Sequence, residues 1–408
     1  MKNFEIHTLG CKLNYSESSS IAAELEKRGW TQGGVPEIVI VNTCAVTSSA
    51  EKKTRNLVSK LHRENPLAAI ILVGCYSALK PELLERWAGV DKVFASANKM
   101  SVVDYVVTRE VTPSPNFFAT YSINDRTRSF LKIQDGCNTH CTYCTVWIAR
   151  GKSRSDTIEG VLKNIDEIAA QGVREVNLTG VNIGDFGRGT DENFTKLLKA
   201  IVKQNAIERV RISSLEPELL TDDIIKLVAK NDILMPHFHL PLQSGCDRIL
   251  SDMRRRYTTA EYAEKVTKIR KLMPDACIAC DVIAGFPGET DEEFEMTYSF
   301  LENLPISYMH VFPYSRRPRT AANIMENQIS EDVKNERAAR LIALSNEKKR
   351  AFYEQCSGQE RPVLVESTVA DDMLSGFTDN YIRVQLPFDE GIVNTIQNVI
   401  VDPCRTVL

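Results

Sequence analysis

Short apolar segments alternate with helical patterns through the first hundred residues, and this alternation constrains the fold more than any other feature of the chain. Three runs have the length and β-branched content of buried strands: 4–9 (FEIHTL), 38–43 (IVIVNT) and 69–74 (AIILVG). Helical periodicity follows at 16–27 and 48–63, and Pro81 marks the start of a third helix. Strands that alternate with helices predict an open parallel α/β sheet.

A second series of the same kind begins after a polar, proline-containing segment at 108–125, which is typical of a linker. Helical patterns separate six further strand-like runs: 130–134, 173–180, 209–215, 237–242, 277–285 and 308–314. Six such units predict a complete or partial β/α barrel, whose reactive groups gather at the C-terminal ends of its strands. After about residue 346 the helical patterns stop, and 361–369 and 380–387 have the character of strands in a small all-β domain.

The composition is that of a globular protein with sizeable cores, since 43% of the 408 residues are hydrophobic and 25% are charged. At about 150 residues per domain, this length predicts two or three domains. No apolar run approaches the roughly 18 residues that a membrane helix needs. The first residues lack the apolar region of a secretory signal, so we expect a cytoplasmic protein without a membrane partner. The net charge of −4 neither requires nor excludes nucleic acid.

The densest chemical signal is the run Cys137-x3-Cys141-x2-Cys144, which directly follows the first strand of the second series. Three thiolates within eight residues can converge on one metal centre, and thiolates select zinc, copper(I) or iron–sulfur clusters. Structural zinc needs four ligands, and His140 is a poor fourth one because its neighbour Cys141 must turn inward. Three cysteines on a four-iron cluster leave one iron free to bind a substrate or cofactor.

A second trio, Cys11, Cys44 and Cys75, is dispersed in the sequence, but each member stands just past the end of a predicted strand. In a parallel sheet these ends share one edge, where open α/β folds bind ligands. The trio therefore predicts a second incomplete metal site. We interpret the other five cysteines as core or surface thiols: Cys246, Cys277, Cys280, Cys356 and Cys404.

These two trios and the blocks around them resemble the radical S-adenosylmethionine (SAM) methylthiotransferase family over nearly the whole chain. The blocks are GCKLN (10–14), NTCAVT (42–47), GCY (74–76), LTGVNIGDFG (178–187), RISSLEP (211–217), HLPLQSG (239–245), DVIAGFPGET (281–290) and FPYSRRP (312–318). The resemblance implies an N-terminal methylthiotransferase domain with an auxiliary cluster (1–115) and a radical SAM core forming a partial (β/α)6 barrel (123–345). It also implies a C-terminal TRAM domain, a small OB-like barrel (346–408).

The resemblance further implies two [4Fe-4S] clusters, one held by each trio, and two SAM molecules for each product. One SAM donates a methyl group to sulfur, and the other is cleaved to a radical that removes hydrogen from the substrate. An electron donor such as flavodoxin or ferredoxin is implied as a partner. Thr145, Val146 and Trp147 depart from the aliphatic pair and proline that are typical of the family, which affects the loop and not the cluster ligands.

The resemblance also assigns SAM contacts, residue by residue. Tyr143 is expected near the adenine, and Gly180, Val181 and Asn182 near the methionine part. Ser213, Ser214 and Glu216 are expected near the ribose or the sulfonium, and Gln243 and Ser244 as further contacts.

The GCKxN block, the NTCAVT block and the basic run KKTR (52–55) are most similar to the branch that acts on N6-threonylcarbamoyladenosine beside the anticodon of tRNA. Branches acting on N6-isopentenyladenosine or on an aspartate of a ribosomal protein are the alternatives. A non-catalytic iron–sulfur RNA-binding protein is the alternative from another class. The tail has six basic and ten acidic residues, so we expect RNA contacts elsewhere. The candidate residues are Lys52, Lys53, Arg55, Arg255 and Arg317.

Overall fold

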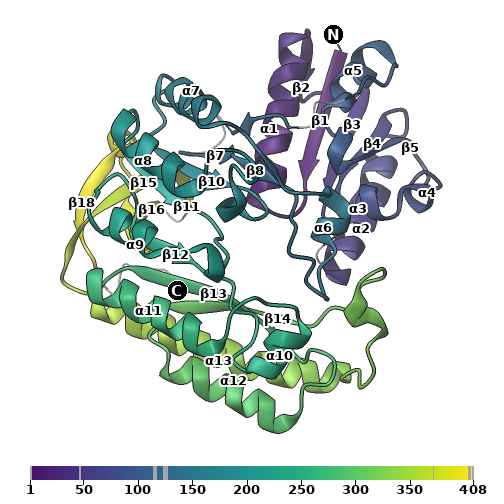
Figure 1. Ribbon diagram of the computed structural model, residues 1–408. Helices are drawn as coiled ribbons and strands as arrows, with labels where there is room; N and C mark the ends of the chain where they lie inside the picture. The colour runs from purple at the N-terminus through teal and green to yellow at the C-terminus, as the bar shows by residue number, and fades with distance from the viewer. Residues whose placement is uncertain are drawn as a thin grey trace.

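The N-terminal part is a five-stranded, wholly parallel sheet of order β2-β1-β3-β4-β5, as the alternation predicts (Figure 1). The computed structural model describes residues 2–45, 47–113, 117–122, 127–370, 372–402 and 406. The strands are β1 (Lys2–Thr8), β2 (Trp30–Gln32), β3 (Ile38–Thr43), β4 (Ala69–Gly74) and β5 (Val90–Ala95).

Helices cover both faces of this sheet. Side chains of α1 (Lys12–Lys27) and α5 (Ser101–Thr108) pack with Phe4 and Ile40 on one face. Those of α2 (Ser48–Glu64), α3 (Cys75–Leu79) and α4 (Pro81–Leu84) pack on the other face with Val41 and Leu72. Because the two cores contain alternate residues of the same strands, the central strands are apolar on both sides.

The central part has six parallel strands in two sheets, of order β11-β10-β7 and β12-β13-β14, with the short β6 (Thr120–Tyr121) antiparallel to β7. Parallel bridges from Val210 to Leu234 and from Ser214 to His239 connect the two sheets. The six strands are β7 (Arg128–Lys132), β10 (Glu175–Thr179), β11 (Arg209–Ile212), β12 (His237–His239), β13 (Cys277–Ala284) and β14 (Tyr308–Pro313). All six lie within or beside the predicted runs.

Helices pack against one face of these strands and form a single large core with them. Several begin at an N-cap side chain that accepts a backbone N–H, such as Thr157, Asn193 and Thr221, and Thr258 and Thr290 complete capping boxes. These helices are α7 (Ile158–Ala169), α8 (Phe194–Gln204), α9 (Asp222–Ala229), α10 (Asp247–Asp252), α11 (Thr259–Leu272) and α12 (Asp291–Asn303).

The prediction that helices stop near residue 346 is wrong, because α13 (Glu331–Gln355) continues past that point. Its last turns carry Phe352 and Tyr353, which are buried against the C-terminal sheet. The helix therefore continues as far as the apolar residues that the tail covers.

The tail is a four-stranded antiparallel sheet of order β17-β16-β15-β18. Its strands are β15 (Glu360–Ala370), β16 (Met373–Thr378), β17 (Arg383–Pro387) and β18 (Ile396–Ile400). Arg209 and Arg211 of β11 donate hydrogen bonds to tail carbonyls at 362 and 377–379. Cys277 and Tyr308, the first residues of β13 and β14, pack with the same sheet. The tail thus covers the N-terminal end of the central strands and leaves their C-terminal ends to the site described below.

Among the helices of the described residues, none is long and apolar enough to cross a membrane. Cys246, Cys277, Cys280 and Cys356 are buried free thiols, as predicted. Cys404 lies outside the described residues.

Candidate active site between two cysteine trios

The N-terminal trio lies at one edge of the first sheet. Thr8 of β1 pairs with Asn42 of β3, and Thr43 pairs with Gly74 of β4, so the three strand ends are adjacent. Gly10 has φ +105°, and a Cβ on it would stand 3.0 Å from the Cys44 sulfur. The backbone just before Cys11 therefore lies against Cys44, which a side chain at residue 10 would prevent. Cys44 and Cys75 are buried, whereas Cys11 is exposed.

The central trio occupies one loop after β7 and the short strand β8 (Gln134–Asp135). The backbone N–H of Thr139 donates to the sulfur of Cys137 at 3.4 Å, and that of Val146 donates to the sulfur of Cys144 at 3.3 Å. Burial, and then the nearby Cys141, raises the pKa of Cys144 to about 12. A thiol of this kind gives up its proton when it binds a metal, which acts as the local positive charge.

The loop of the central trio contacts the edge that carries the N-terminal trio. The hydroxyl of Thr145 donates to the carbonyl of Ala45, next to Cys44, at 3.3 Å. From α6 (Val146–Arg150), Ala149 packs in the same core as Cys75. Arg150 Nε donates to the sulfur of Cys75 at 3.3 Å. Tertiary structure therefore brings the regions that carry the two trios into direct contact.

A buried network of ion pairs connects the N-terminal part of the chain to the central part. Glu17 of α1 has no solvent-exposed side-chain surface, and its carboxylate contacts Lys99, Lys132 (3.1 Å) and Arg150 (3.0 Å). Asp135 pairs with Lys132 (3.2 Å), Arg150 (2.9 Å) and Arg154 (2.8 Å). Burial by itself would raise the pKa of Glu17, but the cations of Arg150, Lys99 and Lys132 hold it well below the usual range. The network has four cations for two carboxylates, because Lys99 and Arg154 join Lys132 and Arg150.

We expect Glu17→Gln to destabilise the protein by about 3–5 kcal/mol, because it leaves buried cations without their partner. The matched control is Glu24→Gln on the same helix, whose half-exposed carboxylate pairs with Arg28; it should cost no more than about 1 kcal/mol. Thermal unfolding of both variants measures the difference.

The same network predicts how the wild type responds to acid. The pKa of Glu17 is depressed, and that of Asp135 is lowered to about 2 because the cations of Arg150 and Lys132 outweigh burial. A depressed carboxyl pKa stabilises the fold above the unfolded value and loses this effect as the pH falls through the folded one. The stability difference between wild type and Glu17→Gln should therefore be largest at neutral pH and shrink below about pH 4.5.

The residues predicted to face SAM surround the C-terminal ends of β10 and β11. Gln134 Oε1 accepts the backbone N–H groups of Val181 (3.0 Å) and Asn182 (2.8 Å), and a Cβ on Gly180 would stand 2.9 Å from that same oxygen. Within the described chain, Asn182 Oδ1 and Ser213 Oγ are buried without a hydrogen-bond partner. Buried polar atoms of this kind need a partner, so both are suited to a polar ligand.

The other predicted SAM contacts divide into two groups. Glu216 pairs with Arg255, which also donates to the sulfur of Cys141 at 3.3 Å, so this ion pair lies beside the central trio. Ser214 is half-buried at the bridge to His239. Ser244, in contrast, is fully buried, and its hydroxyl is hydrogen-bonded to Thr297 and to the N–H of Cys246. Ser244 shapes the turn and does not present its hydroxyl to a ligand.

A cavity of about 230 Å³ opens beside the central cysteine loop. Thr47, the N-cap of α2, lines it from the N-terminal sheet, and Tyr143 lines it from the central cysteine loop. Gln243, Asp281 and Phe312 line it from the strand ends. Phe312 is 43% exposed, so the cavity offers a ring face on which a planar base can stack.

Comparison with known proteins agrees with this geometry. The Radical SAM superfamily model matches residues 131–301, and the model described as "Uncharacterized protein family UPF0004" matches residues 3–95. The chain is 36% identical to the threonylcarbamoyladenosine tRNA methylthiotransferase of Bacillus subtilis, with 98% of this chain and 93% of that protein covered. The protein so named in Thermotoga maritima is 37% identical over 94% of this chain and 91% of its own length.

The chain belongs to the radical SAM methylthiotransferase family. A Clostridium perfringens member of the family, named tRNA-2-methylthio-N(6)-dimethylallyladenosine synthase, is 34% identical over 98% of this chain and 94% of its own length. Among solved structures, the radical SAM methyltransferase TsrM of Kitasatospora setae, with cobalamin and a [4Fe-4S] cluster bound, has a TM-score of 0.60 at 14% identity. It aligns over 92% of this chain and 81% of that chain, and at this identity the likeness shows the fold alone.

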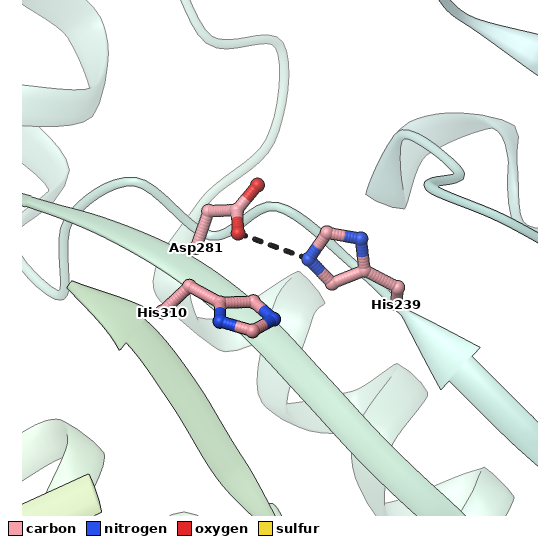
Figure 2. A group of neighbouring side chains, drawn as sticks. All are labelled: His239, Asp281 and His310. Carbon is pink, nitrogen blue, oxygen red and sulfur yellow. Dashed lines mark hydrogen bonds and ion pairs between the residues drawn. The ribbon is translucent and has the colours of Figure 1, made fainter. Parts of the chain in front are cut away.

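The methylthiotransferase contains a side-chain cluster that sequence reasoning missed, formed by His239, Asp281 and His310 (Figure 2). Their ligand atoms lie within 4.8 Å of one another, and His239 Nε2 is 3.0 Å from Asp281 Oδ1. Each of the three residues lies within a different predicted strand, and each was interpreted only as part of that strand. The sequence signal that could have revealed this cluster is a set of polar residues at alternate positions of otherwise apolar strands.

The structure separates the predicted RNA contacts into two groups. Lys52, Lys53 and Arg55 are exposed on α2, which begins just after the Cys44 loop. Arg255 and Arg317 are buried, the first paired with Glu216 and the second with Glu51. The expectation that these two bind the RNA backbone is wrong for this structure, because a guanidinium must be accessible to reach a phosphate. The neighbouring exposed arginines are Arg254, Arg256, Arg316 and Arg319.

Proposed function

We propose that this enzyme attaches a methylthio group to C2 of N6-threonylcarbamoyladenosine in tRNA. The observation that carries the proposal is the contact between the regions that carry the two cysteine trios, through Thr145 with Ala45 and Arg150 with Cys75. An arrangement of this kind can present two different metal centres to one base. The names of the relatives from Bacillus subtilis and Thermotoga maritima support the substrate.

The enzyme uses SAM and [4Fe-4S] chemistry, which supplies the one-electron reactivity needed to remove hydrogen from a carbon with no acidity. The residues fit these groups: Cys137, Cys141 and Cys144 lie in one loop, and two buried polar atoms lack partners in the described chain, the Ser213 hydroxyl and the acceptor Asn182 Oδ1. We propose that Cys11, Cys44 and Cys75 hold a second cluster, and that each product consumes two SAM molecules.

The protein's own side chains would bind and orient the reactants. Tyr143 and Gln243 line the cavity beside the central loop, where they would border the adenine of SAM and the target base. The backbone at Gly180, Val181 and Asn182 is fixed by Gln134, so it would hold the methionine part without a protruding side chain. Glu216 is oriented by Arg255 and Ser213 is free to donate, and both are suited to the ribose.

The six central strands and the tail have finer roles that we also propose. We assign the strands to one partial (β/α)6 barrel and the tail to a TRAM module that binds the tRNA anticodon stem-loop by shape. Lys52, Lys53 and Arg55 are suited to phosphates of that loop, because they are exposed on the helix that follows Cys44. We propose flavodoxin or ferredoxin as the electron donor and, because tRNA is the substrate, the cytoplasm as the location.

Mass spectrometry of tRNA nucleosides tests the substrate assignment. A strain lacking this gene should lose 2-methylthio-N6-threonylcarbamoyladenosine and accumulate its unthiolated precursor, and the wild-type gene should restore the product. In vitro, tRNA with threonylcarbamoyladenosine should be turned over at least about tenfold faster than tRNA with isopentenyladenosine. Equal or faster turnover of the isopentenyl substrate would assign the enzyme to the activity named for the Clostridium perfringens relative. Absence of turnover with either tRNA would favour a non-catalytic iron–sulfur protein.

A further inference from the structure

The cluster of His239, Asp281 and His310 faces the inside of the central strands. Asp281 pairs in register with His310, and His239 pairs with Ala279, two residues before Asp281, so all three side chains point to the same face. The alternate residues of β13, including Cys280 and Val282, are buried on the opposite face in the core with the helices. The three polar side chains therefore point away from the core and toward one another (Figure 2).

This cluster is continuous with the cavity beside the central cysteine loop, because Asp281 belongs to both. Gln243 lines the cavity beside it and has φ +73°, and its backbone N–H is bonded to the carbonyl of Asp281 at 2.8 Å. A positive φ at a buried glutamine is strained, and such strain accumulates at binding sites. A ligand that fills the cavity therefore reaches the cluster directly.

A lysine from the N-terminal part also reaches the central strands. Lys12 extends from the start of α1, and its ammonium lies 5.8 Å from the ring of Phe130 on β7 and 5.9 Å from the ring of Tyr381. Lys12 and His310 are both accessible to solvent. Burial lowers the pKa of Lys12, and burial together with repulsion from His239 and Lys12 lowers that of His310.

We propose that this cluster, together with the adjoining cavity, recognises the threonylcarbamoyl group of the substrate, an inference that rests on the proposed function. Lys12 and His310 would donate to its carboxylate. Asp281, oriented by His239, would accept from its hydroxyl or its urea N–H. The group supplies one anion, one hydroxyl and two N–H donors, which matches the charges and acceptors present. An isopentenyl group has no anion or hydroxyl to offer these side chains, and a site built to hydrogen-bond a substrate group discriminates strongly against an analogue that lacks it.

A divalent metal is the other ligand that two histidines and one carboxylate can bind. The structure favours the organic group, since Asp281 Oδ1 is already bonded to His239 Nε2. Metal analysis decides this point independently of tRNA binding.

The test compares the affinities of the reconstituted enzyme for three tRNAs that differ only in one nucleoside: threonylcarbamoyladenosine, isopentenyladenosine or adenosine. The wild type should prefer the threonylcarbamoyl form, and His310→Gln, Asp281→Asn and Lys12→Met should each reduce this preference at least about tenfold. Affinity for the adenosine form reports whether each variant has folded. The matched control is Cys280→Ala, a residue next to Asp281 in β13 whose side chain is buried on the opposite face in the core with the helices. It should keep the wild-type preference.

Each other outcome counts against a different part of the inference. A wild type without any preference overturns the proposed function together with the inference. A wild-type preference that survives in His310→Gln and Asp281→Asn overturns the inference alone. An additional zinc or iron ion per chain that disappears in His310→Gln assigns the cluster to a metal instead.

Discussion

Replacing Cys137, Cys141 and Cys144 together by alanine should abolish the cleavage of SAM. The wild type, reconstituted anaerobically, should contain about eight iron and eight sulfide ions, and the variant about half of each. The reason is that all three ligands come from one loop, so their loss leaves no partial site for this cluster. Iron and sulfide analysis measures the cluster content, and chromatographic detection of 5′-deoxyadenosine measures the cleavage.

Buried thiols elsewhere in the chain provide the control for this experiment. Cys280→Ala and Cys356→Ala remove cysteines that lie in hydrophobic cores far from either trio in sequence. Both variants should keep the full iron content and the wild-type rate of SAM cleavage. A wild-type protein that binds only four iron ions under full reconstitution would contradict the assignment of a cluster to the N-terminal trio.

Replacing Cys11, Cys44 and Cys75 should have the opposite effect on SAM cleavage: the cleavage should be retained, while methylthiolation should be lost. The central loop keeps its own three ligands, while the sulfur to be transferred has no site at the sheet edge. A triple serine variant is the best choice, because serine at residue 75 preserves an acceptor for Arg150 and so spares the buried network. The two products, 5′-deoxyadenosine and the methylthiolated nucleoside, are measured in the same reaction.

The comparison of serine with alanine separates ligation from packing. If both triple variants lose only the methylthiolated product, the trio acts as a ligand set. If the alanine variant alone loses it, the trio acts by positioning Arg150. Product formation at the wild-type rate by both variants would show that the N-terminal sheet is only structural.

Local patterns predicted the elements whose signals are contained in a few neighbouring residues. The runs at 38–43 and 69–74 became β3 and β4 with unchanged bounds, because a strand buried on both faces is apolar throughout. The missed strands, β2 and β5, lie at the two edges of that sheet. The first has only three residues, and the second carries Asp91 and Lys92 because an edge strand remains partly in water.

The cysteine sites were predictable for a related reason. Cys137, Cys141 and Cys144 are close in sequence, and the parallel topology by itself brings the ends of β1, β3 and β4 to one edge. The buried arginines were not predictable. Arg255 belongs to a basic run that is typical of a solvent-exposed surface. It is buried only because it pairs with Glu216, 39 residues away in the sequence.

The sequence by itself determined the alternation of strands and helices, the two thiol trios and the family to which the chain belongs. Only the tertiary structure decided that the regions carrying the two trios touch, that Glu17 meets Lys99, Lys132 and Arg150, and that His239, Asp281 and His310 form one cluster. The physical reason is that the residues next to a charged or polar side chain in the sequence do not indicate which distant residue will pair with it. Glu17 and Arg150 are 133 residues apart, and their pairing exists only after two sheets have packed against each other.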